Sequence, residues 1–220
     1  MILGTDRSKN ILARVRMLLG QNDDTILNND LVYAVATAKS VDIAETYMCV
    51  ESTLTLPVVS GTNTYTLTAL AATPTVSTGF FRLKLLAPPL TSRVTIVEFD
   101  VNQFDFARRY MRVSTGLPIF YINIYGGVLT FYPTPTVTEN WTISFYKSPS
   151  TVISKAVGPE TPSSFDTALI YGALSELAPL AGKGDQAMIF MQMYEAEKQR
   201  GLEAYRGTRT ESQMITYQDI

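Results

Sequence analysis

The chain has 220 residues, of which 46% are apolar, so it can bury a hydrophobic core as one domain or as one domain with an insertion. It has no histidine and one cysteine, Cys49, which excludes Ser-His-Asp and Cys-His catalysis, histidine-ligated metals, zinc ribbons and disulfide frameworks. The net charge of −2 and the isoelectric point of 5.2 exclude the overall basic surface that tight nucleic-acid binding requires.

The first fifty residues have the apolar spacing of a helical hairpin. The first helix is predicted to be capped by Thr5 or Asp6 and to end at Gly20. Its apolar stripe consists of Ile11, Leu12, Val15, Leu18 and Leu19. A second helix is predicted from residue 28 or 29 to about residue 47. The N-terminal residues lack the pattern of a secretion signal or transit peptide, which favours synthesis in a reducing cytoplasm.

Charged residues are scarce in the middle of the chain, where residues 51–149 hold 12 of the 38 charges. Such a shift in composition indicates a separate domain. We therefore predict an α+β protein in which residues 1–50 and 150–207 form a helical bundle domain and residues 51–149 form an inserted β domain. Residues 208–220 are predicted to be an extended C-terminal tail.

Within this region the apolar residues recur with a period of two, which indicates strands. Leu54–Val58 and the return strand Tyr65–Leu67 flank a polar turn at residues 60–63, and this pattern predicts a β-hairpin. Further strands are predicted over residues 80–86, 93–99, 119–125, 128–132 and 141–146, with Gly126-Gly127 as a tight turn. Five or more short strands predict an antiparallel β-sandwich or small barrel.

The β region also contains two uncharged stretches, residues 52–81 and 113–138. Uncharged segments of this length raise the question of membrane spans. The first stretch contains nine threonines together with prolines and glycines, and the second contains Pro118 and Gly126-Gly127. These residues break a spanning helix, so neither stretch is predicted to enter a membrane.

Helical periodicity returns after Pro159 and Pro162. One face of the next helix consists of Phe165, Leu169, Ala173 and Leu177. A break is predicted at residues 181–184, and a last helix is predicted from about Asp185 to Arg206.

Several local patterns then occur in a characteristic order. After the two N-terminal helices and the hairpin come GLPIFY at residues 116–121 and LTFYPTP at residues 129–135. A strand ending in YKSP at residues 146–149 precedes a helix that carries ALIYGA at residues 168–173. Over nearly its whole length the chain therefore resembles the bacteriophage head-to-tail adaptor proteins, also called connector or tail-tubular-protein-A-like proteins.

This resemblance implies a structural virion protein without catalytic residues or cofactors. In that family a ring of subunits, usually twelve, lies below the portal protein and extends the channel through which double-stranded DNA passes during packaging and ejection. The β-rich end receives the downstream tail or nozzle protein, and the C-terminal segment docks onto the portal in many members. The corresponding candidates here are Arg209, Glu211, Met214, Ile215 and Tyr217.

The start of the last helix is apolar around most of its circumference. Between Ala187 and Tyr194 only Gln192 is polar, so Met188, Ile189 and Met191 cannot all face their own bundle. Methionine-rich surfaces adapt well to partners, and we interpret these three residues as a candidate subunit interface. The alternative is a central helix in a monomeric bundle.

Arg108, Arg109 and Arg112 form the densest basic cluster in the sequence. A lumenal position in a DNA channel is one interpretation, because arginine suits phosphate contact. A solvated loop or an inter-subunit salt bridge is the interpretation that we favour.

Other motifs have simpler explanations than a ligand site. Residues 22–30 are acidic but lack the central glycine and terminal glutamate of a calcium loop, and Gly182-Lys183-Gly184 lacks the spacing of a phosphate loop. Cys49 is expected to be a small buried hydrophobe. The competing functional hypothesis is a ligand- or glycan-binding β-module of a phage tail that uses Trp141 and the tyrosines, and a hydrolase that uses only carboxylates is a weaker third.

Overall fold

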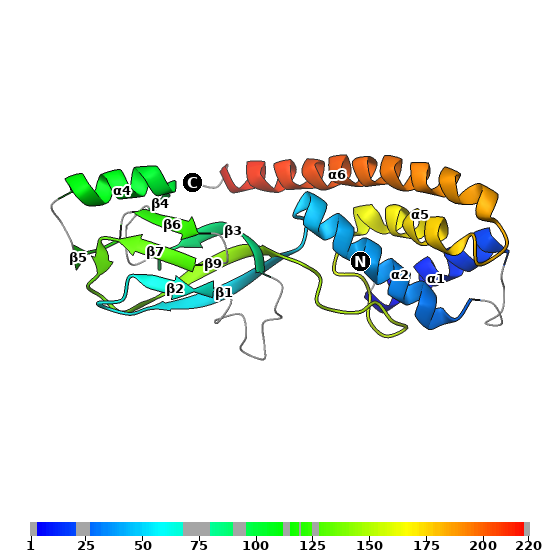
Figure 1. Ribbon diagram of the computed structural model, residues 1–220, viewed down its shortest axis with the longest axis horizontal. Helices are drawn as coiled ribbons and strands as arrows, with labels where there is room; N and C mark the ends of the chain where they lie inside the picture. The colour runs from blue at the N-terminus through cyan, green and yellow to red at the C-terminus, as the bar shows by residue number, and fades with distance from the viewer. Residues whose placement is uncertain are drawn as a thin grey trace. The chain divides into compact units, whose positions relative to one another are not determined.

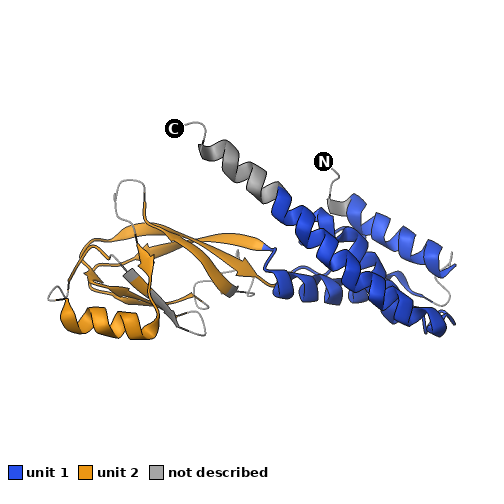
Figure 2. Cartoon of the chain, turned by 90° about the horizontal axis from the view of Figure 1, so that it is seen from above, with its two compact units in different colours: residues 1–50, 151–220 blue, residues 51–150 orange. Residues whose placement is uncertain are grey.

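The computed structural model describes residues 4–20, 27–67, 80–89, 96–111, 115–118, 120–124 and 128–217. The chain divides into two compact units, shown in blue and orange in Figure 2. The helical unit comprises Met1–Val50 and Thr151–Ile220, and the β unit comprises Glu51–Ser150. The chain therefore leaves the helical unit once, forms the β unit, and returns.

The helical unit is built from segments at both ends of the chain (Figure 1). Its helices are α1 (Gly4–Leu19), α2 (Asn29–Tyr47), α5 (Asp166–Leu177) and α6 (Ala187–Tyr217), with short 3-10 turns at Ser163–Phe165 and Gly184–Gln186. Helix α5 packs against α1, α2 and α6. The prediction that the N- and C-terminal helices pack together is confirmed.

The helix boundaries follow local capping chemistry. The Asn28 side chain accepts a 3.0 Å hydrogen bond from the Asp30 amide and starts α2, as predicted. Gly20 and Gly182 adopt left-handed φ angles of 66° and 73° after α1 and α5, which favour glycine. Helix α1 begins at Gly4, ahead of the predicted caps, because nothing in its first turn prevents helical backbone.

The predicted core face of α5 is correct. Phe165, Leu169, Ala173 and Leu177 are all buried, together with Ile11, Val15 and Leu19 of α1. Leu18, predicted on the same stripe, is half exposed because it lies on the flank of α1. Apart from Leu18, these residues belong to one hydrophobic cluster that also includes residues of α2 and Tyr194 of α6.

The last helix is longer than predicted. Helix α6 continues to Tyr217, so the prediction of an extended tail from residue 208 is wrong as far as residue 217. Residues 208–217 contain neither proline nor glycine, and the single Gly207 before them costs a helix only about 1 kcal/mol. Residues 218–220 lie outside the described part of the chain.

The β unit contains nine strands in the described residues. They are β1 (Glu51–Val58), β2 (Thr64–Thr66), β3 (Phe80–Ala87), β4 (Val97–Glu98), β5 (Thr115–Gly116), β6 (Phe120–Ile124), β7 (Val128–Tyr132), β8 (Thr134–Pro135) and β9 (Glu139–Lys147). The sheets have the strand orders β1-β9-β3, β2-β7-β6-β4 and β5-β8. The strands predicted at residues 80–86, 119–125, 128–132 and 141–146 are therefore confirmed, whereas the strand predicted at 93–99 is reduced to Val97–Glu98 in the described residues.

The predicted hairpin between Leu54–Val58 and Tyr65–Leu67 is wrong. Strand β1 instead pairs along β9, with Leu56 opposite Trp141, and β2 pairs with β7. The alternating pattern of β1 fits any antiparallel partner, and β9 offers a nine-residue strand with its own buried alternation of Trp141, Ile143 and Phe145. The β6–β7 pair does form, while its predicted Gly126-Gly127 turn lies outside the described residues.

The barrel alternative is also wrong: in the described residues no barrel closes. The first two sheets instead contribute to one hydrophobic cluster, which contains Leu56, Leu129, Phe131 and Trp141. The sheets are mainly antiparallel, but β4 pairs with β6 and β5 with β8 in parallel. The protein is therefore α+β with small sheets.

The β unit includes a helix that was not predicted, α4 (Val101–Tyr110). Asp100 caps it: its side chain accepts a 2.8 Å hydrogen bond from the Gln103 amide, and the Gln103 side chain accepts one from the Asp100 amide at 3.2 Å. Phe104 and Ala107 form the inner face of α4 and pack in a small cluster with Tyr132. The capping-box pattern Asp-x-x-Gln was the signal available in the sequence.

Candidate assembly surfaces

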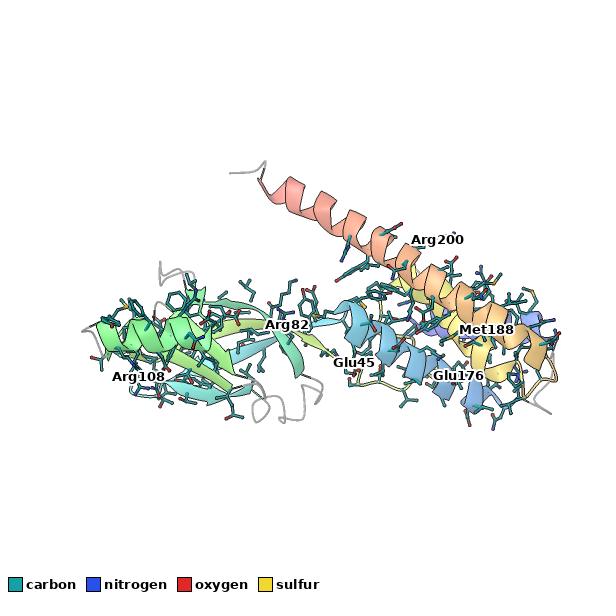
Figure 3. All side chains as sticks on the ribbon, turned by 45° about the horizontal axis from the view of Figure 1, so that its top comes forward. Glu45, Arg82, Arg108, Glu176, Met188 and Arg200 are labelled. Atoms are coloured by element: carbon teal, nitrogen blue, oxygen red, sulfur yellow. The ribbon has the colours of Figure 1, made fainter. Side chains whose placement is uncertain are left out.

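The apolar start of α6 is exposed in the isolated chain. The side chains of Met188, Ile189, Met191 and Met193 are 69%, 52%, 41% and 42% exposed (Figure 3 labels Met188). The first three are the candidates from the sequence, and the structure adds Met193. Met193 lies four residues after Ile189, so the sequence already places both residues on the same side of the helix. A helix central to a monomeric bundle would bury these side chains, so that alternative is wrong.

These four side chains lie on two different sides of α6. Tyr194, Lys198 and Gly201 are buried and mark the inner face of the helix. Because successive residues of an α-helix turn by about 100°, Met188 and Met191 flank this face on one side, and Ile189 and Met193 flank it on the other. Helix α6 therefore carries two separate apolar flanks.

Two glycines allow close contact at the inner face of α6. A Cβ atom on Gly201 would lie 2.7 Å from Phe165 Cδ1 and 2.9 Å from the Ser164 carbonyl oxygen. A Cβ atom on Gly172 of α5 would lie 3.0 Å from the Tyr194 ring. Only glycine leaves this space, so α5 and α6 are held close together and the two flanks are fixed in position.

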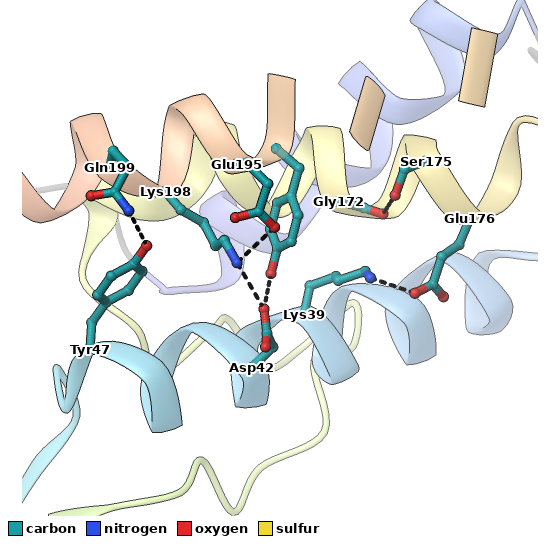
Figure 4. Close-up of polar contacts among 10 residues, drawn as sticks. Lys39, Asp42, Tyr47, Gly172, Ser175, Glu176, Glu195, Lys198 and Gln199 are labelled. Carbon is teal, nitrogen blue, oxygen red and sulfur yellow. Dashed lines mark hydrogen bonds and ion pairs between the residues drawn. The ribbon is translucent and has the colours of Figure 1, made fainter. Parts of the chain in front are cut away.

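A polar cluster between α2 and α6 fixes the rotation of α6 about its axis (Figure 4). The Tyr194 hydroxyl donates a 2.5 Å hydrogen bond to Asp42 Oδ2. Lys198 Nζ lies 3.4 Å from the same oxygen and 2.9 Å from Glu195 Oε1. The ammonium of Lys198 also lies 4.5 Å from the centre of the Tyr194 ring, a cation–π contact.

The pKa values of this cluster reflect its mutual stabilisation. Burial raises the pKa of Asp42, but the hydrogen bond from Tyr194 and the positive charges of Lys198 and Lys39 outweigh burial, so the net pKa is lower than usual. Burial lowers the pKa of Lys198, but Glu195 and Asp42 outweigh it, so the net pKa is raised. Burial and the adjacent carboxylate raise the pKa of Tyr194, which therefore stays a neutral donor.

Two further ion pairs join the helices around α5. Lys39 Nζ of α2 lies 2.5 Å from Glu176 Oε1 of α5. Arg7 of α1 pairs with Asp166 at the start of α5 and donates to the carbonyl oxygen of Thr161 at 2.9 Å. Among the described residues these polar contacts do not involve the apolar flanks of α6, whose side chains are exposed.

Two of the three arginine candidates, Arg108 and Arg109, lie in a helix and not in the predicted loop. Arg108 and Arg109 lie in the last turn of α4 and are exposed, where a positive charge also complements the helix dipole (Figure 3 labels Arg108). Arg112 lies outside the described residues. The side chains of the C-terminal candidates, Arg209, Glu211, Met214, Ile215 and Tyr217, are likewise outside the described part.

The Gly182-Lys183-Gly184 segment and Cys49 lie within the described residues. Lys183 Nζ donates a 3.1 Å hydrogen bond to the Leu18 carbonyl oxygen, so the Gly-Lys-Gly segment is a turn that caps α1. Cys49 is buried, which raises the pKa of its thiol to about 11. Residues 22–26 of the acidic stretch lie outside the described part of the chain. Across the remaining described residues, no group of His, Cys, Asp and Glu could hold a metal ion.

The residue proposed for glycan binding is not at a surface. Trp141 is 2% exposed and packs edge-on against Phe131, with ring centroids 5.2 Å apart. The Tyr65 and Tyr132 hydroxyls donate to backbone carbonyl oxygens. A sugar-binding platform built on Trp141 is therefore wrong, because this ring is part of the core between the sheets.

The chain matches a known protein family. The family model described as SU10 adaptor protein matches residues 8–216 and so extends over both units. No curated protein matches the chain. Among the described residues, none of the helices is long and apolar enough to cross a membrane.

Proposed function

This chain belongs to the SU10 adaptor protein family, which makes it a phage head-to-tail adaptor and a structural protein of the virion, and we propose that it closes a ring below the portal. The ring would extend the DNA channel, contact the portal on one side and receive the tail on the other. The observation that carries this proposal is the pair of exposed apolar flanks on α6, at Met188/Met191 and Ile189/Met193.

Two separate flanks suit a ring. A cyclic ring uses a heterologous interface, in which one patch of a subunit contacts a different patch of the next. In such a ring, one flank of α6 in one subunit would contact the other flank of α6 in the next subunit. The glycine contacts and the Asp42 cluster support this geometry because they prevent α6 from turning its apolar side chains inward.

The C-terminal end of α6 is our candidate for portal contact, and the β unit is our candidate for tail contact. The β unit carries 12 of the 38 charges of the chain over residues 51–149, so hydrogen bonds and shape would set its contacts more than salt bridges. The arginines of α4 are exposed and need no lumenal role in this arrangement.

The test is negative-stain microscopy of the purified chain mixed with its portal. We expect closed rings on the narrow end of the portal with the wild-type chain, and none with Met188→Gln/Met191→Gln or with Ile189→Ser/Met193→Ser. Val152→Ser, a change at an equally exposed valine outside α6, is the matched control and should form normal rings.

Mixing the two double variants sharpens the test. Each variant retains one intact flank, so a heterologous interface allows the pair to form one dimer with no further growth. Analytical ultracentrifugation should therefore detect dimers only in the mixture. A wild-type chain that stays monomeric with portal would contradict the proposal, and so would variants that form rings normally.

A further inference from the structure

A pocket of about 630 Å³ lies between α1, the first turn of α2 and the loop around Lys155. Among the described residues, three cations and one carboxylate line it: Lys9, Arg16, Lys155 and Asp30. We propose that this pocket takes the connection between α5 and α6 of a neighbouring copy of this chain, with Asp185 of that copy held by the cations. The inference rests on the proposed ring and adds a second contact to it.

The pocket has the opposite charge to the rest of the chain. Its described lining has a net charge of +2, whereas the whole chain has a net charge of −2. Without these four groups, the 18 cations and 20 carboxylates of the chain become 15 and 19, a net charge of −4. A carboxylate on another copy is therefore complementary to the pocket, and a cation is not.

The two lysines of the pocket are available to a ligand. Lys155 is exposed and forms neither an ion pair nor a hydrogen bond with the described residues. Lys9 Nζ lies 4.0 Å from Asp6 Oδ1, and both side chains are 57% exposed, so water screens this contact. The Asp30 carboxylate forms no ion pair within the described part of the chain, so it occupies neither ammonium group.

Tyr33 supplies a buried donor to the same pocket. It is 4% exposed and lines the pocket, and its hydroxyl has no hydrogen-bond partner among the described residues. A buried hydroxyl without a partner is costly, so this group favours a ligand that carries an acceptor. A carboxylate accepts from the hydroxyl and from ammonium groups at once. Leu12 and Ala13 add apolar lining, which suits an apolar side chain on the same ligand.

The connection between α5 and α6, residues 178–186, offers both kinds of group. In the described helical unit, Asp185 and Glu203 are the exposed carboxylates outside the pocket that form no ion pair or hydrogen bond. Asp185 lies three residues before Met188, so it borders the apolar flanks of α6. Leu180 of the same connection is 58% exposed, so the connection provides an apolar anchor as well as a carboxylate.

The backbone holds this connection in a fixed shape. The Lys183 amide donates a 2.8 Å hydrogen bond to the Ala178 carbonyl oxygen, and the Gln186 amide donates one of 3.0 Å to the Lys183 carbonyl oxygen. Lys183 Nζ donates to the Leu18 carbonyl oxygen, so the single cation of the connection contacts its own α1. A fixed segment loses little conformational entropy on binding. Because the pocket and the connection are different patches of one chain, their contact is heterologous, as a ring requires.

Zero-length cross-linking tests this contact in the wild-type chain. A water-soluble carbodiimide joins a lysine amine to a carboxylate that touches it, and mass spectrometry identifies both residues. Isotope-labelled and unlabelled chains are mixed in equal amounts and assembled on the portal, so a link between copies can carry both labels. We expect mixed-label links from Lys9 or Lys155 to Asp185. Lys9 and Asp6 lie within one chain and should give single-label links, which serve as the internal control.

Charge reversal tests the same contact through ring formation. Lys9→Glu/Lys155→Glu and Asp185→Lys should each lower the number of closed rings on the portal at least about tenfold, because like charges then meet. A chain with all three changes has an attractive contact again and should recover most of the rings. The matched control, Arg14→Glu/Arg109→Glu, makes the same change in net charge at exposed arginines outside the pocket lining and should form rings normally. Near-ultraviolet circular dichroism checks that each variant keeps its fold.

The outcomes separate this proposal from the ring itself. Rings that form without mixed-label links to Asp185 overturn the pocket proposal and leave the ring proposal standing. Links from the pocket lysines to the portal also overturn it, because the portal would then occupy the pocket. If the wild-type chain closes no ring, the ring proposal fails, and cross-linking of the mixed-label chain alone at high concentration still decides whether the pocket binds Asp185 of another copy.

Discussion

The Tyr194 hydroxyl of α6 donates a 2.5 Å hydrogen bond to Asp42 Oδ2 of α2, and these residues are 152 positions apart in the chain. Lys198 lies one turn further along α6 and approaches the same carboxylate. This contact joins the N-terminal part of the helical unit to the C-terminal part. It also sets which side chains of α6 face outward, so it is a structural condition for the proposed interface.

Removing this hydrogen bond should destabilise the helical unit. We expect Tyr194→Phe to lower the free energy of unfolding by about 1.5–3 kcal/mol, the range for a hydrogen bond to a charged group. Urea unfolding followed by far-ultraviolet circular dichroism measures this value. Tyr171→Phe is the control, because its ring stacks on Phe190 with centroids 6.4 Å apart and this contact does not depend on the hydroxyl. Equal losses in both variants would contradict the prediction.

The same cluster predicts a pH dependence. The folded-state pKa of Asp42 lies below the ordinary value of 3.8, so its contribution to stability is fully present above that value. The contribution is lost as the pH falls through the lowered folded-state pKa, because the unfolded state then binds the proton first. Unfolding free energies measured between pH 6 and pH 2.5 should fall less steeply in Asp42→Asn than in the wild-type chain. Parallel curves would contradict the prediction, because Asp42 would then contribute nothing to the dependence of stability on pH.

The glycines of α6 should respond in opposite directions to the same substitution. Gly201→Ala places a Cβ atom 2.7 Å from Phe165 Cδ1, and we expect a loss of about 1–3 kcal/mol from overpacking. Gly207→Ala meets nothing within 4 Å, and we expect a gain of up to about 1 kcal/mol from higher helix propensity. Thermal unfolding of both variants tests the pair, and similar shifts in Tm would contradict the assigned contact.

The capping box of α4 should control local opening of that helix. Asp100→Ala removes the acceptor for the Gln103 amide, which is worth about 1 kcal/mol. We expect faster amide hydrogen exchange within α4 and unchanged exchange in β9, measured by NMR or mass spectrometry. Asp100→Asn keeps an acceptor and should exchange almost as slowly as the wild-type chain. Uniform acceleration across the β unit would mean that α4 does not open independently.

Trp141 provides an internal probe of the β unit, because it is the only tryptophan in the chain. Its burial between the sheets predicts a blue-shifted emission maximum and weak quenching by acrylamide in the folded state, with both changing on unfolding. Glycans should leave this emission unchanged. Strong acrylamide quenching in the folded protein would contradict the placement of the ring in the core.

Local sequence patterns were sufficient for several elements. Asn28 capped α2 as predicted because capping involves only neighbouring residues, and the buried face of α5 followed from its spacing of Phe165, Leu169, Ala173 and Leu177. Helix α4 was also recoverable from Asp100 and Gln103, but its ten residues lie among strands and offer only a short period.

Other features depended on distant parts of the chain. The spacing predicted the helix α2, but its buried face depends on packing against α5. The structure buries Val32, Ala36 and Ile43 and leaves Leu31 half exposed. Strand β1 alternates in the way a hairpin requires, yet it pairs with β9, more than eighty residues away, because that partner completes the core around Trp141.

The candidate surfaces divide in the same way. The absence of histidine, the scarcity of charge and the apolar start of the last helix are properties of the sequence, and they alone excluded most catalysis and indicated an assembly surface. Only the tertiary structure decided that the exposed side chains of α6 form two flanks, that Met193 joins them, and that Phe106 and Tyr110 of α4 are exposed. Exposure is what remains after every other element has packed, so a local pattern cannot determine it.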